Sequence, residues 1–421
     1  MNDIIVQKFG GTSVADTDKI KNVAKAVIRE KNLGHSVVVV VSAMGHTTDM
    51  LLKLAGEISP NPSSREMDML LSTGEGVSIA LLAMALQAQG CDAVSMNAMQ
   101  VGIFTEKVHT KARIIDIKTD KITQYLEEGK VVVIAGFQGI TDDFEITTLG
   151  RGGSDTSAVA LAGALNAKRC DIYTDVEGVY TTDPRIVPCA SKLKQISYEE
   201  MMELAFGGAN VLHPRAVETA MTHKTPVRVR STFKLDDLGT LILGVDEMEI
   251  QKPVTGVASD LTRIRIVVCD VPDNPGVAAL LFDKLAEENI SVDMIIQSYA
   301  RKDLHTNDIA YTMEKADLDK AMHVLQQIKP DLGYSRVFVD ENIANISIVG
   351  AGMIGKPGIA AKMFRTLANL GINIKMIATS DIKISCLVDS QKANEAVEAL
   401  HTVFGLDSKE IAVVKGDLPN L

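Results

Sequence analysis

The chain has 421 residues, of which 46% are hydrophobic and 23% charged, and its formal charge at pH 7 is −11. This length predicts about three globular domains, and the acidic balance argues against nucleic acid as the main partner. With no apolar run of about 18 residues and no basic-then-apolar N-terminal segment, the sequence predicts neither a membrane span nor a signal peptide.

The five cysteines are odd in number, widely spaced and include no Cys-x-x-Cys pair. This pattern is typical of reduced thiols in a cytoplasm, and it predicts neither a disulfide framework nor a zinc site. His213, which precedes a proline, is expected to have a structural role, and no residue is assigned as a metal ligand.

Strand-forming runs alternate with helical patterns over the first two-thirds of the chain. The expected strands are residues 4–6, 37–41, 131–135, 171–173 and 227–229. The expected helices are residues 20–28, 67–89 and 156–165. This alternation predicts an α/β fold in which helices cover both faces of a sheet.

A glycine loop, Lys8-Phe9-Gly10-Gly11-Thr12-Ser13, connects the first strand to a helix expected near Asp16. Glycines let the backbone approach a ligand closely, and free N–H groups can bind phosphate oxygens. Lys8 adds a positive charge for the β and γ phosphates. The loop lacks the Walker spacing, and by itself it fits an ordinary strand-to-helix turn equally well.

A second glycine loop, residues 147–156, also runs from an extended segment into a helix. Arg151 in this loop can hold a substrate carboxylate through two parallel hydrogen bonds. Asp155 could orient Lys8 or hold Mg²⁺, and it could also cap the following helix.

Three further segments offer polar groups beside expected strands. Residues 173–185 could wrap a nucleotide base and ribose, or form a long surface loop. Residues 42–49 follow the 37–41 strand, at the edge where open α/β sheets bind ligands. Glu75 opens a helix, where it is either a partner of the helix dipole or a partner for a substrate ammonium group.

None of these segments offers an obvious general base. An alcohol acceptor usually needs a base, whereas a carboxylate acceptor is already ionised at pH 7. Lys8, Arg151, Mg²⁺ and backbone N–H groups would position such an acceptor and neutralise its charge. The set therefore favours a kinase whose acceptor is a carboxylate.

The pattern breaks at residues 246–255, and an internal duplication follows. Residues 275–279 recur at 357–361, an offset of 82 residues (357 − 275) that later falls to 75 (396 − 321). The first copy is therefore expected to carry about seven extra residues near 301–307. Each copy reads βαββαβ, which is typical of a ferredoxin-like fold, and neither contains a charged cluster suited to chemistry. We therefore expect the duplication to serve binding or assembly.

Taken together and in this order, these segments closely resemble the aspartokinase family over essentially the whole chain. The most specific signatures are residues 8–13, 150–155 and 174–185, and the duplication resembles the family's tandem ACT domains. The resemblance implies an amino-acid-kinase (carbamate-kinase-like) sandwich domain over residues 1–247, followed by ferredoxin-like ACT domains over 262–340 and 343–416. The length leaves no room for a fused homoserine dehydrogenase, so a monofunctional form is expected.

The resemblance implies that ATP, with Mg²⁺, phosphorylates the side-chain carboxylate of L-aspartate, the first step of lysine, threonine and methionine biosynthesis. Lys8 and Asp155 would lie at the phosphoryl-transfer centre. The implied aspartate-binding residues are Thr47, Thr48, Glu75, Arg151, Gly152, Gly153 and Ser154. The implied ATP-binding residues are Lys8, Phe9, Gly10, Gly11, Thr174, Asp175, Tyr180, Asp183, Arg185 and Asn210. Many members of the family carry a lysine in place of Asn210.

The resemblance also implies feedback inhibition by lysine, threonine or both through the ACT domains. The implied effector residues are Asp273, Asn274, Pro275, Gly276, Val277, Ala278 and Gln297 of the first copy, with Asn373 and Ile374 of the second. Because ACT domains pair side by side, a homodimer or higher oligomer is expected. An internal start at Met248 could supply a separate regulatory subunit, although it is one of 18 methionines.

Two alternatives stay open at this stage. A glutamate or acetylglutamate kinase would share the fold, but the ACT pair argues against it. An inert amino-acid sensor would keep the scaffold, but the intact Lys8, Arg151 and Asp155 argue against that.

Overall fold

The computed structural model describes residues 2–209, 211–247, 252–298 and 305–408, and it divides into two compact units. The first unit contains Met1–Gln251 with Ser408–Leu421, and the second contains Lys252–Asp407. The division falls within the boundary expected at residues 246–255. Met248 and Asn210, and most of the expected insertion at 301–307, lie outside the described residues.

An eight-stranded sheet forms the centre of the first unit, in the order β10-β12-β11-β9-β1-β2-β6-β3. Its strands are β1 (Ile4–Phe9), β2 (Ser36–Val41), β3 (Ala93–Met96), β6 (Val131–Ala135), β9 (Arg169–Thr174), β10 (Gln195–Ser197), β11 (Val227–Ser231) and β12 (Thr240–Leu243). Neighbouring strands pair in parallel except β11 and β12, which are antiparallel. All five valines of Val37–Val41 are buried, as expected for a strand covered on both faces.

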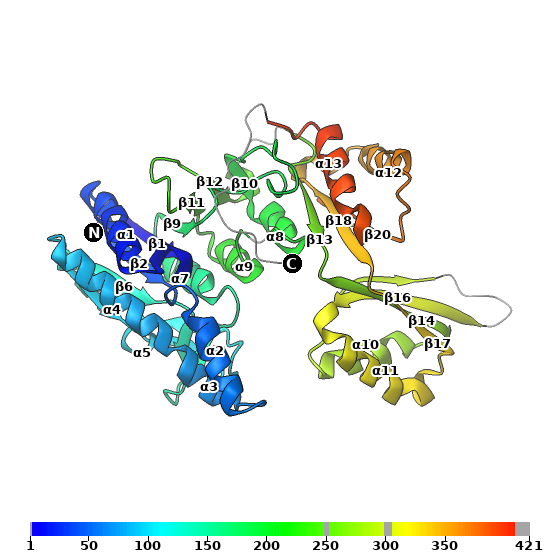
Figure 1. The fold of residues 1–421 in the computed structure, drawn as a ribbon, viewed down its shortest axis with the longest axis horizontal. Helices are drawn as coiled ribbons and strands as arrows, with labels where there is room; N and C mark the ends of the chain where they lie inside the picture. The colour runs from blue at the N-terminus through cyan, green and yellow to red at the C-terminus, as the bar shows by residue number, and fades with distance from the viewer. Residues whose placement is uncertain (1, 210, 248–251, 299–304, 409–421) are drawn as a thin grey trace. The chain divides into compact units, whose positions relative to one another are not determined.

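Helices cover both faces of this sheet, as the sequence predicts (Figure 1). On one face, α1 (Thr17–Asn32) and α4 (Thr73–Ala88) share an apolar core with the alternate valines of β2. On the other, α7 (Gly153–Ala164) packs on β1 and on α9 (Pro214–His223). The remaining helices are α2 (Thr47–Ile58), α3 (Ser64–Leu71), α5 (Ala98–Val101), α6 (Asp120–Glu127) and α8 (Tyr198–Phe206).

The segment 67–89 is mostly helical, as expected: it contains the end of α3 and all of α4, and only Ser72, whose backbone is itself helical (φ −64°, ψ −15°), separates the two. By length and composition alone, the helical stretch Ser64–Ala88 could cross a membrane. However, Leu82 and Leu86 of α4 are completely buried in the core beside α1 and the sheet. A core helix accounts for this composition.

The order of the strands reverses at β1, whose neighbours are β2 on one side and β9 on the other. In open α/β sheets, ligands bind at the carboxyl ends of the strands beside such a reversal. The first glycine loop lies at this end of β1. A small second sheet, in the order β5-β4-β7-β8, flanks the same unit. Its strands are β4 (Ile103–Thr105), β5 (Ile114–Ile117), β7 (Gln138–Ile140) and β8 (Ile146–Thr148).

The second unit contains two ferredoxin-like sheets. The first copy has the predicted βαββαβ order: β14 (Arg263–Pro272), α10 (Val277–Glu287), β15 (Val292–Gln297), β16 (Thr306–Glu314), α11 (Leu318–Leu332) and β17 (Arg336–Asp340). The second copy contains β18 (Ile343–Val349), α12 (Ile359–Asn369), β19 (Met376–Thr379), β20 (Lys383–Asp389) and α13 (Ala393–Val403). The repeat is close: α10 and α12 both follow a left-handed glycine, Gly276 at φ +94° and Gly358 at φ +92°.

The sheet of the second copy contains a strand that the sequence did not predict. Its order is β13-β18-β20-β19, and β13 (Gly256–Asp260) precedes the first copy in the chain. Gly350, which follows β18, lets the chain before β13 approach closely, because a Cβ on Gly350 would lie 2.3 Å from the carbonyl oxygen of Pro253. The last strand expected for the second copy, within residues 409–416, lies outside the described residues.

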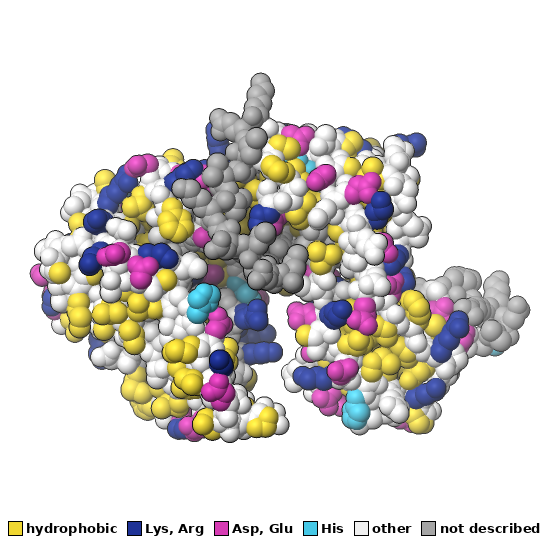
Figure 2. Space-filling model, in the orientation of Figure 1, with side chains coloured by type: hydrophobic (Ala, Val, Ile, Leu, Met, Phe, Trp, Pro, Cys, Tyr) yellow, Lys and Arg dark blue, Asp and Glu magenta, His cyan; other side chains and the backbone are white. Residues whose placement is uncertain are grey.

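The visible face of each unit carries basic and acidic side chains close to one another (Figure 2).

Candidate active site

Lys8 and Asp155 form an ion pair at the carboxyl end of β1. Lys8 lies on β1 and Asp155 in the first turn of α7, and the Lys8 Nζ to Asp155 Oδ1 distance is 2.6 Å. Their side chains are only 11% and 15% exposed, so the pair is largely shielded from water. Among the described residues, Asp155 makes no other ion pair. Asp155 therefore orients Lys8, whereas α7 is capped at Gly152 without a side-chain bond, so Asp155 is not its N-cap.

Two glycines allow the loops around this pair to meet. A Cβ on Gly11 would lie 2.8 Å from the carbonyl oxygen of Ala43, which follows β2, and Gly45 N–H donates to the Gly11 carbonyl at 3.0 Å. Gly152 has φ +68°, and a Cβ there would lie 2.2 Å from the Cβ of His213. Larger residues at Gly11 or Gly152 would force the loops apart.

The structural role expected for His213 is confirmed. Its Nδ1 accepts a hydrogen bond of 3.3 Å from the backbone N–H of Arg215 and so caps α9. Burial lowers the pKa of His213, which keeps the ring neutral and able to accept that bond.

Glu75 is a buried carboxylate in the first turn of α4. It is 2% exposed, and its Oε1 accepts a bond of 3.2 Å from Ala43 N–H, while Oε2 has no partner among the described residues. Burial raises the pKa of Glu75 to about 7. Thr47 lies close by, because a Cβ on Gly74 would be 3.5 Å from its methyl carbon. Thr48, the next residue of α2, is partly exposed.

Arg151 has no bonding partner in the described part of the chain, and its side chain is exposed. Ser154, three residues after Arg151, is 8% exposed. It packs against Gly136, because a Cβ on Gly136 would lie 2.8 Å from the Cβ of Ser154. Gly153 N–H closes the loop by donating to the Gly150 carbonyl at 3.0 Å. The loop thus presents a free guanidinium beside the start of α7.

The residues expected at the nucleotide lie beyond the end of β9. The Thr174 hydroxyl donates to Asp175 Oδ1 at 3.0 Å. Arg185 donates to both oxygens of Asp183, at 2.9 and 2.6 Å. Burial tends to raise the pKa of Asp183, but the bonds from Arg185 lower it overall. Burial raises the pKa of Tyr180 to about 12, so its hydroxyl stays protonated.

Phe9 differs from a typical ligand residue. Its side chain is completely buried and stacks on Tyr173, with the ring centroids 4.5 Å apart. Any contact of Phe9 with a nucleotide would therefore come from its backbone.

The expected effector residues divide between the two ACT copies. Residues 273–276 form an exposed loop between β14 and α10, and Val277 and Ala278 begin α10. In the loop, Asp273 Oδ1 accepts a bond of 3.1 Å from Asn307. Gln297 is exposed at the end of β15, whereas Asn373 and Ile374 precede β19. Among the described residues, no hydrogen bond or ion pair joins Gln297 to either of them. The two sheets do meet elsewhere, since a buried cluster contains Met294, Ile343, Met376 and Leu387.

Three residues that hold the second glycine loop were not predicted. Asp68 and His109 lie beneath it, and Arg215 donates to the carbonyl of Leu149 at 2.5 Å. No motif marks these positions in the sequence, because Asp68 and Arg215 contact the loop, and His109 contacts Asp68, across many residues of chain.

The buried Glu75 predicts a pH dependence of stability. Its folded pKa of about 7 exceeds the ordinary value of 4.5, so between these pH values the folded state holds a proton that the unfolded chain has lost. The contribution of Glu75 to the free energy of unfolding therefore falls as pH rises through this window, by about 3 kcal/mol in total. Denaturant unfolding should show less loss of stability in Glu75→Gln than in the parent chain between pH 5 and pH 7.5. An identical loss in both would contradict the burial argument.

Comparisons with known proteins agree on the family. The amino acid kinase family matches residues 3–231, and an ACT domain matches residues 264–328 and 346–404. The chain is 50% identical to aspartokinase 2 of Bacillus subtilis over 410 residues, which cover 97% of this chain and 100% of that protein. It is 52% identical to an aspartokinase of Bacillus sp. strain MGA3, over 97% of this chain and 98% of that one.

Solved structures give the same result. The aspartokinase III of E. coli in complex with aspartate and ADP superposes with a TM-score of 0.82 at 29% identity, over 95% of this chain and 99% of that one. The aspartate kinase of Synechocystis is 49% identical, with a TM-score of 0.54, over 98% of this chain and 71% of that one. With an amino-acid-kinase fold followed by two ACT domains, the chain belongs to the aspartokinase family.

Proposed function

We propose that this protein transfers the γ-phosphoryl group of ATP to the side-chain carboxylate of L-aspartate, giving 4-phospho-L-aspartate and ADP. This is the first step of lysine, threonine and methionine biosynthesis. The Lys8–Asp155 pair at the end of β1 carries the proposal, because it fixes one positive charge where open α/β sheets bind ligands. The related E. coli enzyme was solved with aspartate and ADP.

Phosphoryl transfer to a carboxylate requires positioning and charge neutralisation more than proton transfer. Asp155 holds the Lys8 ammonium in place, so Lys8 can stabilise the charge that develops on the transferred group without reorganising. Gly10 and Gly11 let the backbone approach the phosphates. The loop residues Thr174, Asp175, Tyr180, Asp183 and Arg185, together with Asn210, would line the rest of the nucleotide.

Asp155 also fits a role in holding Mg²⁺. Magnesium in kinases is bound through one or two carboxylates and the substrate phosphates, and Asp155 supplies a carboxylate beside Lys8 at the end of β1. When bound, the ion would neutralise phosphate charge.

The aspartate would lie between two groups of opposite charge. Arg151 would bind a carboxylate, and the unpartnered Oε2 of Glu75 would accept from the ammonium group. Thr47, Thr48, Gly152, Gly153 and Ser154 would supply hydroxyls and N–H groups around it. A substrate ammonium beside Glu75 would favour its ionised form and so lower its pKa.

Coupled measurement of ADP release tests the proposal. Aspartate should support turnover, while glutamate, acetylglutamate and UMP should support little. Equal or greater turnover of another acceptor would contradict the assignment of aspartate, and no turnover of any acceptor would favour an inert sensor.

We further propose feedback inhibition by lysine, threonine or both through the ACT domains. The E. coli enzyme was also solved with lysine and aspartate, and that structure superposes with a TM-score of 0.75 at 28% identity. Inhibition measured with lysine and threonine, separately and together, identifies the effector.

Gln297→Ala should weaken inhibition and leave the uninhibited rate nearly unchanged. Gln297 is exposed at the end of β15, so its truncation removes a ligand contact without opening a cavity. Inhibitor titration of the two proteins under the same conditions provides the measurement. Unaltered sensitivity would place the effector pocket elsewhere.

We propose a homodimer or higher oligomer formed through the ACT sheets. One of the two outer strands of each sheet carries an exposed isoleucine, Ile295 on β15 and Ile377 on β19. Open strand edges with apolar residues are ready to pair with another chain. Met248 could start a separate regulatory subunit, and the free cysteines are consistent with a cytoplasmic location.

A further inference from the structure

A buried carboxylate lies beneath the loop that carries Arg151. We propose that Asp68 is a positioning residue for the aspartate site, which fixes the Arg151 loop relative to the helix that carries Glu75. This inference rests on the proposed function, since it assumes that Arg151 binds the substrate carboxylate.

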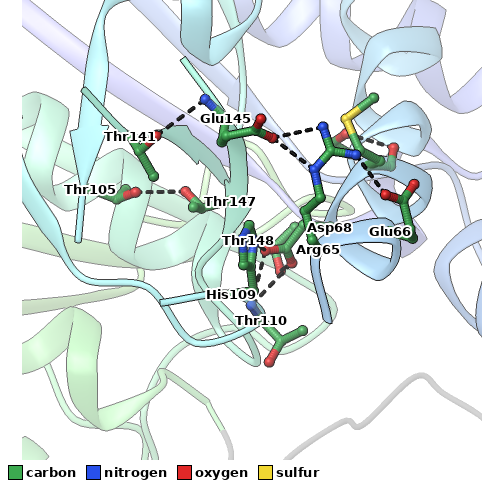
Figure 3. Close-up of polar contacts among 12 residues, drawn as sticks. Arg65, Glu66, Asp68, Thr105, His109, Thr110, Thr141, Glu145, Thr147 and Thr148 are labelled. Carbon is green, nitrogen blue, oxygen red and sulfur yellow. Dashed lines mark hydrogen bonds and ion pairs between the residues drawn. The ribbon is translucent and has the colours of Figure 1, made fainter. Parts of the chain in front are cut away.

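Asp68, on α3, is completely buried and accepts hydrogen bonds from three residues (Figure 3). The Thr148 hydroxyl donates to Oδ1 at 2.6 Å, and the Thr110 N–H donates at 3.0 Å to Oδ2. Nδ1 of His109 lies 2.7 Å from Oδ2, at hydrogen-bond distance, and donates to it in the tautomer with the hydrogen on Nδ1. The network is fully satisfied, so it can hold its members in one arrangement.

Two of these donors are connected to the Arg151 loop. Thr148 ends β8, and Arg151 follows three residues later. Thr110 lies against the loop itself, because a Cβ on Gly150 would be 2.9 Å from the Thr110 carbonyl oxygen. Thr110 has φ +67°, a strained conformation for a β-branched residue, which persists only when its surroundings hold it. The bond to Asp68 supplies that restraint.

The same carboxylate is connected to the other side of the proposed aspartate site. α3 ends at Leu71, and α4, whose first turn carries Glu75, begins at Thr73. The carbonyl of Ser72, between the helices, accepts a bond of 3.0 Å from Gln138 on β7. Asp68 thus joins the helix pair leading to Glu75 with the hairpin leading to Arg151. A displacement of about 1 Å between them can cost about a hundredfold in rate.

A residue that only stabilises the fold would give a different kinetic result. Loss of stability lowers the amount of folded enzyme and hence the apparent kcat, but it does not change the KM of one substrate selectively. Loosening of the turn that carries Arg151 acts mainly on aspartate, because Asp155 lies in α7, which packs on β1, and the proposed ATP-binding loops follow β1 and β9. The separation of the two KM values therefore distinguishes a positioning role from a structural one.

Asp68→Asn and Thr148→Val test the inference, since each removes one hydrogen-bond group with little change in shape. Each should raise the KM for aspartate by about tenfold or more while leaving the KM for ATP within about twofold. Thr148→Ser retains the hydroxyl and should restore nearly normal values. If Asp68→Asn does not fold, the Thr148 pair of variants still decides the question.

Glu145→Gln provides a matched control. It breaks an exposed ion pair in which Arg65 Nη2 and Glu145 Oε2 are 2.8 Å apart, and which joins α3 to the same hairpin (Figure 3). Because exposed pairs contribute little, both KM values should stay within about twofold. Three outcomes would overturn the inference. Asp68→Asn could shift both KM values equally, Thr148→Ser could be as impaired as Thr148→Val, or Glu145→Gln could behave like Asp68→Asn.

Arg151→Ala separates this inference from the proposed function. If the parent chain does not use aspartate, or if Arg151→Ala leaves its KM unchanged, the proposed function or the role of Arg151 fails. If Arg151→Ala raises that KM and neither Asp68→Asn nor Thr148→Val does, only the positioning role is overturned.

Discussion

Replacing Lys8 with alanine should lower kcat about a thousandfold and leave the KM for aspartate nearly unchanged. The Lys8 ammonium group is held 2.6 Å from Asp155, and the Lys8 side chain is only 11% exposed. If the side chain is removed, water cannot readily supply an equivalent positive charge at that place. A fixed charge beside a transferring phosphoryl group contributes several kcal/mol to lowering the barrier, and about 4 kcal/mol corresponds to a thousandfold. Steady-state kinetics at saturating ATP and aspartate provide the measurement.

The Lys8→Ala experiment needs a control for the loss of the ion pair with Asp155. Removing Lys8 leaves a poorly solvated carboxylate without its partner, which destabilises the fold. The double variant Lys8→Ala/Asp155→Asn removes that unpaired charge and should recover thermal stability without recovering activity. A Lys8→Ala enzyme that is folded and retains most of its kcat would exclude Lys8 from the mechanism.

Arg151→Ala should raise the KM for aspartate about a hundredfold, with no measurable change in the temperature of unfolding. Hydrogen bonds to charged groups contribute about 1.5–3 kcal/mol each, and a guanidinium can make two to one carboxylate. The side chain is exposed and has no partner among the described residues, so its removal costs the fold nothing.

Arg151→Lys sharpens this test. It retains the positive charge but loses the planar fork, so its KM for aspartate should fall between those of the parent chain and Arg151→Ala. If Arg151→Ala unfolds at a lower temperature and its KM is unchanged, Arg151 supports the loop instead of the substrate.

Local patterns were enough to predict most of the fold. The all-valine run Val37–Val41 and the helical spacing of residues 20–28 record burial directly, and both elements form as expected. The close approach of the glycine loops to their surroundings was also predictable from the sequence. Gly11 and Gly152 lie where a side chain would collide with a neighbouring loop. The Lys8–Asp155 pair followed from the chemistry that those two loops share.

Features that depend on distant partners were not predicted. Asp68 bonds to residues 42 and 80 positions away, and nothing beside it in the sequence distinguishes it from a surface acid. The strand β13 follows a polar segment typical of a linker, and its role becomes visible only through its pairing with β18.

That pairing makes the first ACT copy an insertion within the second, which affects how the chain can fold as it is synthesised. β13 leaves the ribosome before the whole first copy, while its partner β18 follows that copy. The inserted copy begins with β14 and ends with β17, which are neighbouring strands paired from Arg265 with Asp340. Once the inserted copy has folded, it therefore holds the ends of β13 and β18 close together. The entropic cost of joining them is then that of a short loop, although some eighty residues separate them along the chain.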